Sequence, residues 1–146
     1  MTTATAVDAR APNRWLRAIG LGFLAEASTV VTIIAVVTCY RYILARGLPD
    51  AAYAAFAART GEVVGVIGGA LYTFLFARLI TKRLSARFIE HGIVVALSAI
   101  AFSIAGSLAG HQGVPAGYVL ASVLKLAGGA FAGFLASRRY APASAA

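Results

Sequence analysis

Residues 93–124 read IVVALSAIAFSIAGSLAGHQGVPAGYVLASVL and contain no Asp, Glu, Lys or Arg. A membrane-crossing α-helix needs about 20 apolar residues, so this stretch holds most of two such helices. The sequence His111–Pro115 marks a tight turn between them, and Pro115 suits the first turn of the second helix. A helical hairpin of membrane-spanning length is therefore the starting point for the fold.

Two more apolar stretches precede this hairpin. The four stretches are Leu16–Tyr40, Gly61–Ile80, Gly92–Gly110 and Gly117–Ala136. With 60% hydrophobic and 12% charged residues, the chain has too little polar surface for a soluble globule. Strands are excluded because an open sheet cannot span lipid and four segments cannot close a barrel. The sequence predicts an all-α integral membrane protein, an up-down four-helix bundle.

One domain accounts for nearly the whole chain. We expect the four-helix domain to cover residues 15–140, with spans at about 16–40, 61–80, 92–110 and 117–136. Residues 1–14 and 141–146 are expected to be disordered tails. The loop between the first two spans contains an alanine-rich run that either lies at the membrane interface or lengthens the second span.

The net charge of +8 is distributed unevenly along the chain. Nine basic residues fall on one side of the predicted membrane and three on the other. The nine are Arg10, Arg14, Arg17, Arg78, Lys82, Arg83, Arg87, Arg138 and Arg139, and the three are Arg41, Arg46 and Arg59. By the positive-inside rule, this asymmetry predicts a multi-pass protein of the cell inner (plasma) membrane with both termini in the cytoplasm. The expected partners of the basic residues are anionic lipid headgroups, not nucleic acid.

Small residues recur every fourth position in the second and fourth spans. The second span has Gly61, Gly65, Gly69, Thr73 and Ala77, and the fourth has Gly117, Ala121, Gly129, Gly133 and Ser137, with Lys125 in the remaining slot. Such stripes allow close helix packing, so we expect packing contacts at Gly61, Gly65, Gly69, Gly129 and Gly133. The stripes could face helices of the same chain, a second copy or another membrane protein.

A possible internal repeat has an offset of 60 residues. Gly68–Arg78 and Gly128–Arg138 agree at six of eleven positions. Both segments run in the same direction through the predicted membrane, as a duplicated two-helix hairpin would require. The alternative is chance recurrence of Gly, Ala and Leu, because the first and third spans match poorly.

Two charges lie deep inside predicted spans. Glu26 is nine residues from Arg17 and Lys125 is thirteen from Arg138, which at 1.5 Å per residue gives depths of about 13 and 19 Å. The first and last helices of an up-down bundle are neighbours, so an ion pair between these residues is geometrically easy. The pair could be a proton- or ion-linked site or a structural lock. Glu62 is a possible third member or an end cap of the second span.

Other chemistry is sparse. His91 and His111 lie on opposite sides of the predicted membrane and cannot share a metal, and Cys39 is the only cysteine. No Gly-rich loop carries the Lys-Ser/Thr of a phosphate-binding site. The sequence therefore predicts no enzyme, metal site or cofactor.

Two resemblances follow from short motifs. Gly68–Arg78, His91-Gly92 and Leu124–Gly129 together resemble a type of small, uncharacterised four-helix bacterial membrane protein, which implies a fold but no activity. Leu24-Ala25-Glu26 is similar to the first helix of the small multidrug transporters, in which a glutamate carries drug and proton. The long first loop, the basic second loop and Lys125 depart from that second pattern.

The sequence favours a non-enzymatic membrane protein, an accessory or assembly component that works with itself or with a partner. The alternative is a small proton-linked transporter or channel subunit that uses Glu26. A titratable group facing a hydrated cavity would favour transport, and a dry, packed pair would favour a structural role.

Overall fold

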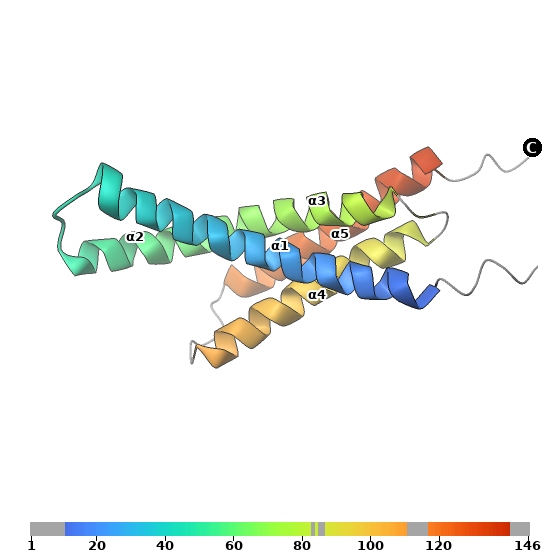
Figure 1. Cartoon of the computed structure of the whole chain (residues 1–146), viewed down its shortest axis with the longest axis horizontal. Helices are drawn as coiled ribbons and strands as arrows, with labels where there is room; N and C mark the ends of the chain where they lie inside the picture. Colours follow the sequence, from blue (N-terminus) through green and yellow to red (C-terminus); the bar gives the residue numbers. More distant parts are fainter. Residues whose placement is uncertain (1–10, 83, 85–86, 111–116, 141–146) are drawn as a thin grey trace, which may run out of the picture.

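The computed structural model describes residues 11–82, 84, 87–110 and 117–140, which form a bundle of four long helical segments (Figure 1). The first segment is α1 (Ala11–Cys39) continued by the π-helical turn η2 (Tyr40–Leu44), and the second joins α2 (Asp50–Val63), η3 (Val64–Gly68) and α3 (Gly69–Thr81). The other two are α4 (Phe88–Ala109) and α5 (Gly117–Tyr140). The predicted all-α four-helix bundle is confirmed, and all four segments are long and apolar enough to cross a membrane.

The first two segments are longer than predicted. Helix α1 begins at Ala11, inside the expected tail, while residues 1–10 and 141–146 of the two expected tails lie outside the described residues. The alanine-rich run after Pro49 forms α2 and lengthens the second span. A segment of 32 residues is about 48 Å long, against about 30 Å for a hydrocarbon core. The α1–α2 hairpin therefore reaches well beyond the end of α4 (Figure 1).

Aromatic contacts hold the tip of this hairpin together. Tyr40 stacks on Phe56 at 3.7 Å between ring centroids. The Tyr53 hydroxyl donates to the Ala45 carbonyl at 2.7 Å and accepts from the Leu48 amide at 3.0 Å. These bonds satisfy backbone groups of the turn between η2 and α2, which no helix ladder would satisfy.

The order of helices around the bundle differs from a simple ring of consecutive neighbours. Helix α1 packs on α3 and α4, and α5 packs on the same two helices, so α1 and α5 lie diagonally opposite. The expectation that the first and last helices are neighbours is therefore wrong. Two parallel pairs, α1 with α4 and α3 with α5, lie side by side instead. Their closeness depends on Gly22, which faces the backbone of α4 at Val95, and on Gly128, which faces the Ala70 carbonyl of α3.

Glycines also set the antiparallel contact between α4 and α5. A Cβ on Gly92 would overlap the Gly129 carbonyl oxygen, and a Cβ on Gly129 would overlap that of Gly92. One turn further along α5, Gly133 lies against the backbone of Phe88 and Ile89. This mutual approach of backbones is the packing that small residues permit in membrane helices. The predicted packing positions Gly129 and Gly133 are thus at helix contacts.

Gly61 and Gly65 depart from the predicted packing stripe. Within the described part of the chain, a Cβ on either would meet no atom of another helix within 4 Å, whereas a Cβ on Gly69 would lie 2.7 Å from the Lys125 Cε. The physical reason is the π-helical turn Val64–Gly68. A π turn holds more residues than an α turn, so the helix face changes there and the four-residue spacing no longer follows one line.

The first prediction compares two glycines of this set. Gly129→Ala should lower the thermal midpoint of the protein in mild detergent, because the added Cβ forces the α4 and α5 backbones apart at a typical cost of about 1–3 kcal/mol. Gly65→Ala should lower the midpoint less than Gly129→Ala, since no other helix of the described chain lies within 4 Å of the added Cβ and alanine is the better helix former. Equal loss of stability in both variants would contradict the packing described here.

Candidate functional site

Three polar side chains from three helices meet near the middle of the bundle. They are Glu26 of α1, Ser103 of α4 and Lys125 of α5, called the central cluster below. Lys125 Nζ donates to Glu26 Oε2 at 2.6 Å, and Ser103 Oγ donates to Glu26 Oε1 at 2.6 Å. The lysine Nζ is also 3.4 Å from Ser103 Oγ. Each carboxylate oxygen therefore receives a short hydrogen bond from a different helix.

The second segment donates no side chain to the central cluster and instead makes room for it at Gly69. Lys125 extends past Gly69 of α3, where its Cε occupies the space that a Cβ would need. Glycine at this position therefore gives the lysine stem a route across the bundle, which explains how a residue on α5 reaches its diagonal neighbour α1. The small-residue spacing predicts a close contact at Gly69, and the atoms in that contact belong to the Lys125 side chain.

The side chains of Lys125 and Glu26 are largely buried inside the bundle. The Lys125 side chain is 4% exposed and the Glu26 side chain 15%. A single charge at the middle of a membrane helix costs about 2.5–3.5 kcal/mol on insertion scales, so each charge needs its partner. Hydrogen bonds between ionised groups are shorter and stronger than neutral ones, and both short bonds to Glu26 fit that class. The two residues form a buried, hydrogen-bonded ion pair that links α1 to α5.

Neutral hydrogen bonds also link the helices of the bundle. Thr32 of α1 and Tyr72 of α3 join through their hydroxyls at 2.9 Å. The Tyr118 hydroxyl of α5 donates to the Ile100 carbonyl of α4 at 3.0 Å. Together with the ion pair, these bonds tie α1 to α3, α4 to α5 and α1 to α5. The sequence alone did not single out Tyr72, Tyr118 or Ser103, because hydroxyl residues occur throughout the spans.

Glu62 does not join the central cluster. Its side chain is exposed, and one carboxylate oxygen lies 3.9 Å from the position that a Cβ on Gly117 would take. Gly117 is eight residues before Lys125, a distance of about 12 Å along α5. Glu62 therefore lies beside the start of α5, away from the central cluster, and its carboxylate is exposed.

His91 is a buried polar residue at the other end of α4. Its ring stacks on Trp15 of α1 at 4.1 Å between centroids, and its Nδ1 lies 2.9 Å from the Arg87 carbonyl oxygen. Because that oxygen only accepts, Nδ1 carries the proton, and no described residue provides a hydrogen-bond partner for Nε2. Twelve residues, about 18 Å of helix, separate His91 from Ser103. Within the described residues, no three His, Cys, Asp or Glu side chains form a group that could hold a metal ion.

No family model matches this chain, and no curated protein or solved structure matches it. The function must therefore be inferred from the geometry of the central cluster. Both carboxylate oxygens of Glu26 are already engaged, one by the Lys125 ammonium and one by the Ser103 hydroxyl. In the arrangement observed, the cluster joins helices.

The second prediction tests the energetic coupling within the pair. Glu26→Gln and Lys125→Met should each destabilise the bundle, because removal of one partner from a buried pair costs about 3–5 kcal/mol in soluble proteins. The double variant should recover much of the loss, and the difference is the coupling energy of a double-mutant cycle. Unfolding in mild detergent provides the measurement. Strict additivity of the two single effects would show that the charges do not stabilise one another.

Proposed function

We propose that this chain is a non-enzymatic multi-pass membrane protein, an accessory or assembly component, in which the Glu26–Lys125 pair has a structural role. The observation that carries the proposal is the burial of Lys125, 4% exposed and hydrogen-bonded to Glu26 inside the bundle. A transport site must exchange its ligand with water, whereas a lock is most effective when it stays closed. The pair is largely buried and each charge has a hydrogen-bond partner, which favours the lock.

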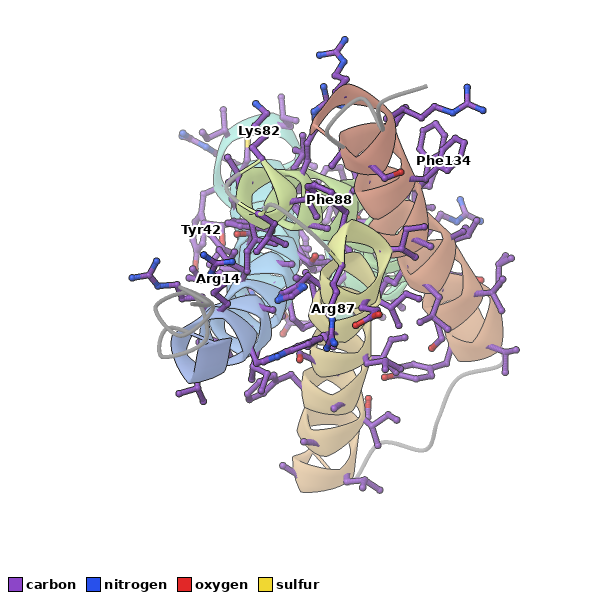
Figure 2. All side chains as sticks on the ribbon, turned by 90° about the vertical axis from the view of Figure 1, so that its right-hand side faces the viewer. Arg14, Tyr42, Lys82, Arg87, Phe88 and Phe134 are labelled. Carbon is purple, nitrogen blue, oxygen red and sulfur yellow. The ribbon has the colours of Figure 1, made fainter. Side chains whose placement is uncertain are left out.

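The proposed location is the cell inner (plasma) membrane, with both termini in the cytoplasm. The starts of α1 and α4 and the ends of α3 and α5 lie at one end of the bundle, called the basic end below (Figure 1). Figure 2 looks onto that end, where Arg14, Lys82 and Arg87 are labelled. Seven of the nine basic residues counted on this side belong to the described residues, and they support the orientation through the positive-inside rule.

An open small-residue face supports the assembly part of the proposal. Among the described residues, a Cβ added to Gly61 or Gly65 would meet no atom of another helix within 4 Å, so neither glycine lies at a close helix contact. Membrane helices associate through such faces, because small residues let two backbones approach. A second copy of the chain or a helix of another membrane protein would fit there.

The alternative function is a small proton-linked transporter or channel subunit that uses Glu26. Two observations favour it over other activities. Glu26 keeps 15% of its side chain exposed, more than its partner. The π-helical turn Val64–Gly68 directly precedes Gly69, against which Lys125 packs, and π turns are frequent at functional sites. The likeness of Leu24-Ala25-Glu26 to small multidrug transporters belongs to this alternative.

The third prediction separates the two functions by proton flux. Protein reconstituted in vesicles with a pH-sensitive dye inside should carry no more flux under a pH gradient than protein-free vesicles, because a locked pair offers no exchanging proton. Glu26→Gln should then leave the flux unchanged. Flux in the unmodified protein that Glu26→Gln abolishes would overturn the structural proposal in favour of transport.

The matched control is Glu62→Gln, which removes one carboxylate outside the central cluster. It should behave as the unmodified protein in either case.

Native mass measurement of the same preparation tests assembly: a mass that is a multiple of 15.0 kDa is expected, and Gly65→Leu should reduce it to the single chain. A single-chain mass for the unmodified protein would contradict self-association and leave a different membrane protein as the partner.

A further inference from the structure

We propose that the basic end carries a binding site for the phosphate headgroup of an anionic phospholipid, formed between α3 and α5 by Arg78, Lys82 and Arg139. The proposal goes beyond a general attraction of basic residues to the membrane, because it assigns three cations to one position. It rests on the proposed membrane location. It does not depend on whether the central cluster locks the bundle or carries protons.

A small surface pocket lies between the ends of the two helices. Arg78 and Lys82 at the end of α3 and Arg139 of α5 line it, and Leu135 and Ala136 complete the lining. Ala136 is 5% exposed and gives the pocket an apolar floor. Guanidinium groups present planar, paired N–H donors that match phosphate oxygens, and an ammonium adds a mobile point charge. The described lining residues therefore supply the donors and the charge for a phosphate, and none of them is acidic.

The positive charge of the pocket is not neutralised by the described part of the protein. The chain has five acidic residues. Glu26 pairs with Lys125, Asp50 with Arg41 and Glu90 with Arg87, while Glu62 lies toward the hairpin end and Asp8 outside the described residues. Within the described residues, no carboxylate oxygen lies within 4 Å of the three pocket cations. An external anion is therefore the partner that this site lacks.

Two facing stripes indicate that the anion belongs to a lipid. Along α3 and its C-terminal end, Phe74, Arg78 and Lys82 are spaced four residues apart, and residues at this spacing share one helix face. On α5, Phe131 and Leu135 precede Arg139 at the same spacing. The two phenylalanine rings stack at 6.0 Å between centroids, so the stripes face each other.

Along these stripes the surface changes from aromatic to cationic toward the basic end. Phe131 is 53% exposed, and on the same helix Phe134, which is labelled in Figure 2, is 39% exposed. The guanidinium carbon of Arg138 lies 4.6 Å from the centroid of the Phe134 ring. A free phosphate would use only the cationic part. A phospholipid would place its phosphate at the pocket and its acyl chains along the exposed apolar surface. It would therefore contact both the cationic and the aromatic parts of this surface. Basic pockets between membrane helices recognise anionic headgroups in this way.

The experiment measures thermal stabilisation by added lipid. The full chain in mild detergent is titrated with phosphatidylglycerol, with phosphatidylcholine or with inorganic phosphate, and the thermal midpoint is followed. Phosphatidylglycerol should raise the midpoint with saturation, and the other two should not. Lys82→Gln/Arg139→Gln, which changes two exposed side chains, should raise the half-saturating concentration about 25-fold, because each basic residue near an anionic lipid contributes about 1 kcal/mol, or about fivefold in affinity.

The matched control is Arg14→Gln/Arg17→Gln, which removes two exposed charges at the same end of the bundle but on α1. It should keep the response of the unmodified protein within about twofold, since these charges do not line the pocket. Equal weakening in both double variants would overturn the site and leave only general charge attraction. Saturating stabilisation by inorganic phosphate alone would overturn the lipid as its source. Neither outcome of the lipid titration changes the expected result of the vesicle flux test. The lipid site and the structural role of the ion pair can therefore be disproved independently.

Discussion

The ion pair between Glu26 and Lys125 is the interaction on which the rest of the bundle depends. Neither charge is tolerable alone in a low-dielectric interior, and the two belong to helices that lie diagonally opposite. The pair therefore fixes the relative height and rotation of α1 and α5. Ser103 adds a hydrogen bond from α4, and Gly69 of α3 makes room for the lysine stem, so all four segments contribute to one contact.

Close approach of the backbones is the second requirement for this contact. A lysine side chain can cross the bundle only where no side chain of an intervening helix blocks its path. Gly69 leaves this space free because it has no Cβ. The Gly92–Gly129 contact draws α4 against α5 one turn from Lys125, and Gly22 draws α1 against α4 one turn from Glu26. The polar contact and the small-residue contacts thus support each other. Where the chain leaves this region, as at Gly61 and Gly65, the small residues lie open.

Much of this arrangement could be predicted from the sequence, because long apolar stretches and isolated charges carry strong physical constraints. The four segments, the contact between Glu26 and Lys125 and the packing role of Gly129 all follow from spacing. The diagonal position of α1 and α5 does not follow from spacing. Four helices connected one after another can be arranged around a bundle in several orders, and the loops do not decide between them. The π-helical turn at Val64–Gly68 has no sequence signal that we recognise, and it moves Gly61 and Gly65 off the packing face. Ser103 looks like any other serine in an apolar span.

The most direct test of the pair is a solid-state NMR measurement in lipid bilayers. Lys82 and Lys125 are the only lysines, so Lys82→Arg leaves one ammonium that can be labelled with ¹⁵N, and glutamate is labelled with ¹³C at the carboxyl. We predict strong dipolar dephasing of the Lys125 Nζ signal, as the 2.6 Å contact with Glu26 requires, and loss of this dephasing in Glu26→Gln. Dephasing no greater in the Lys82→Arg protein than in the Glu26→Gln variant would contradict the ion pair.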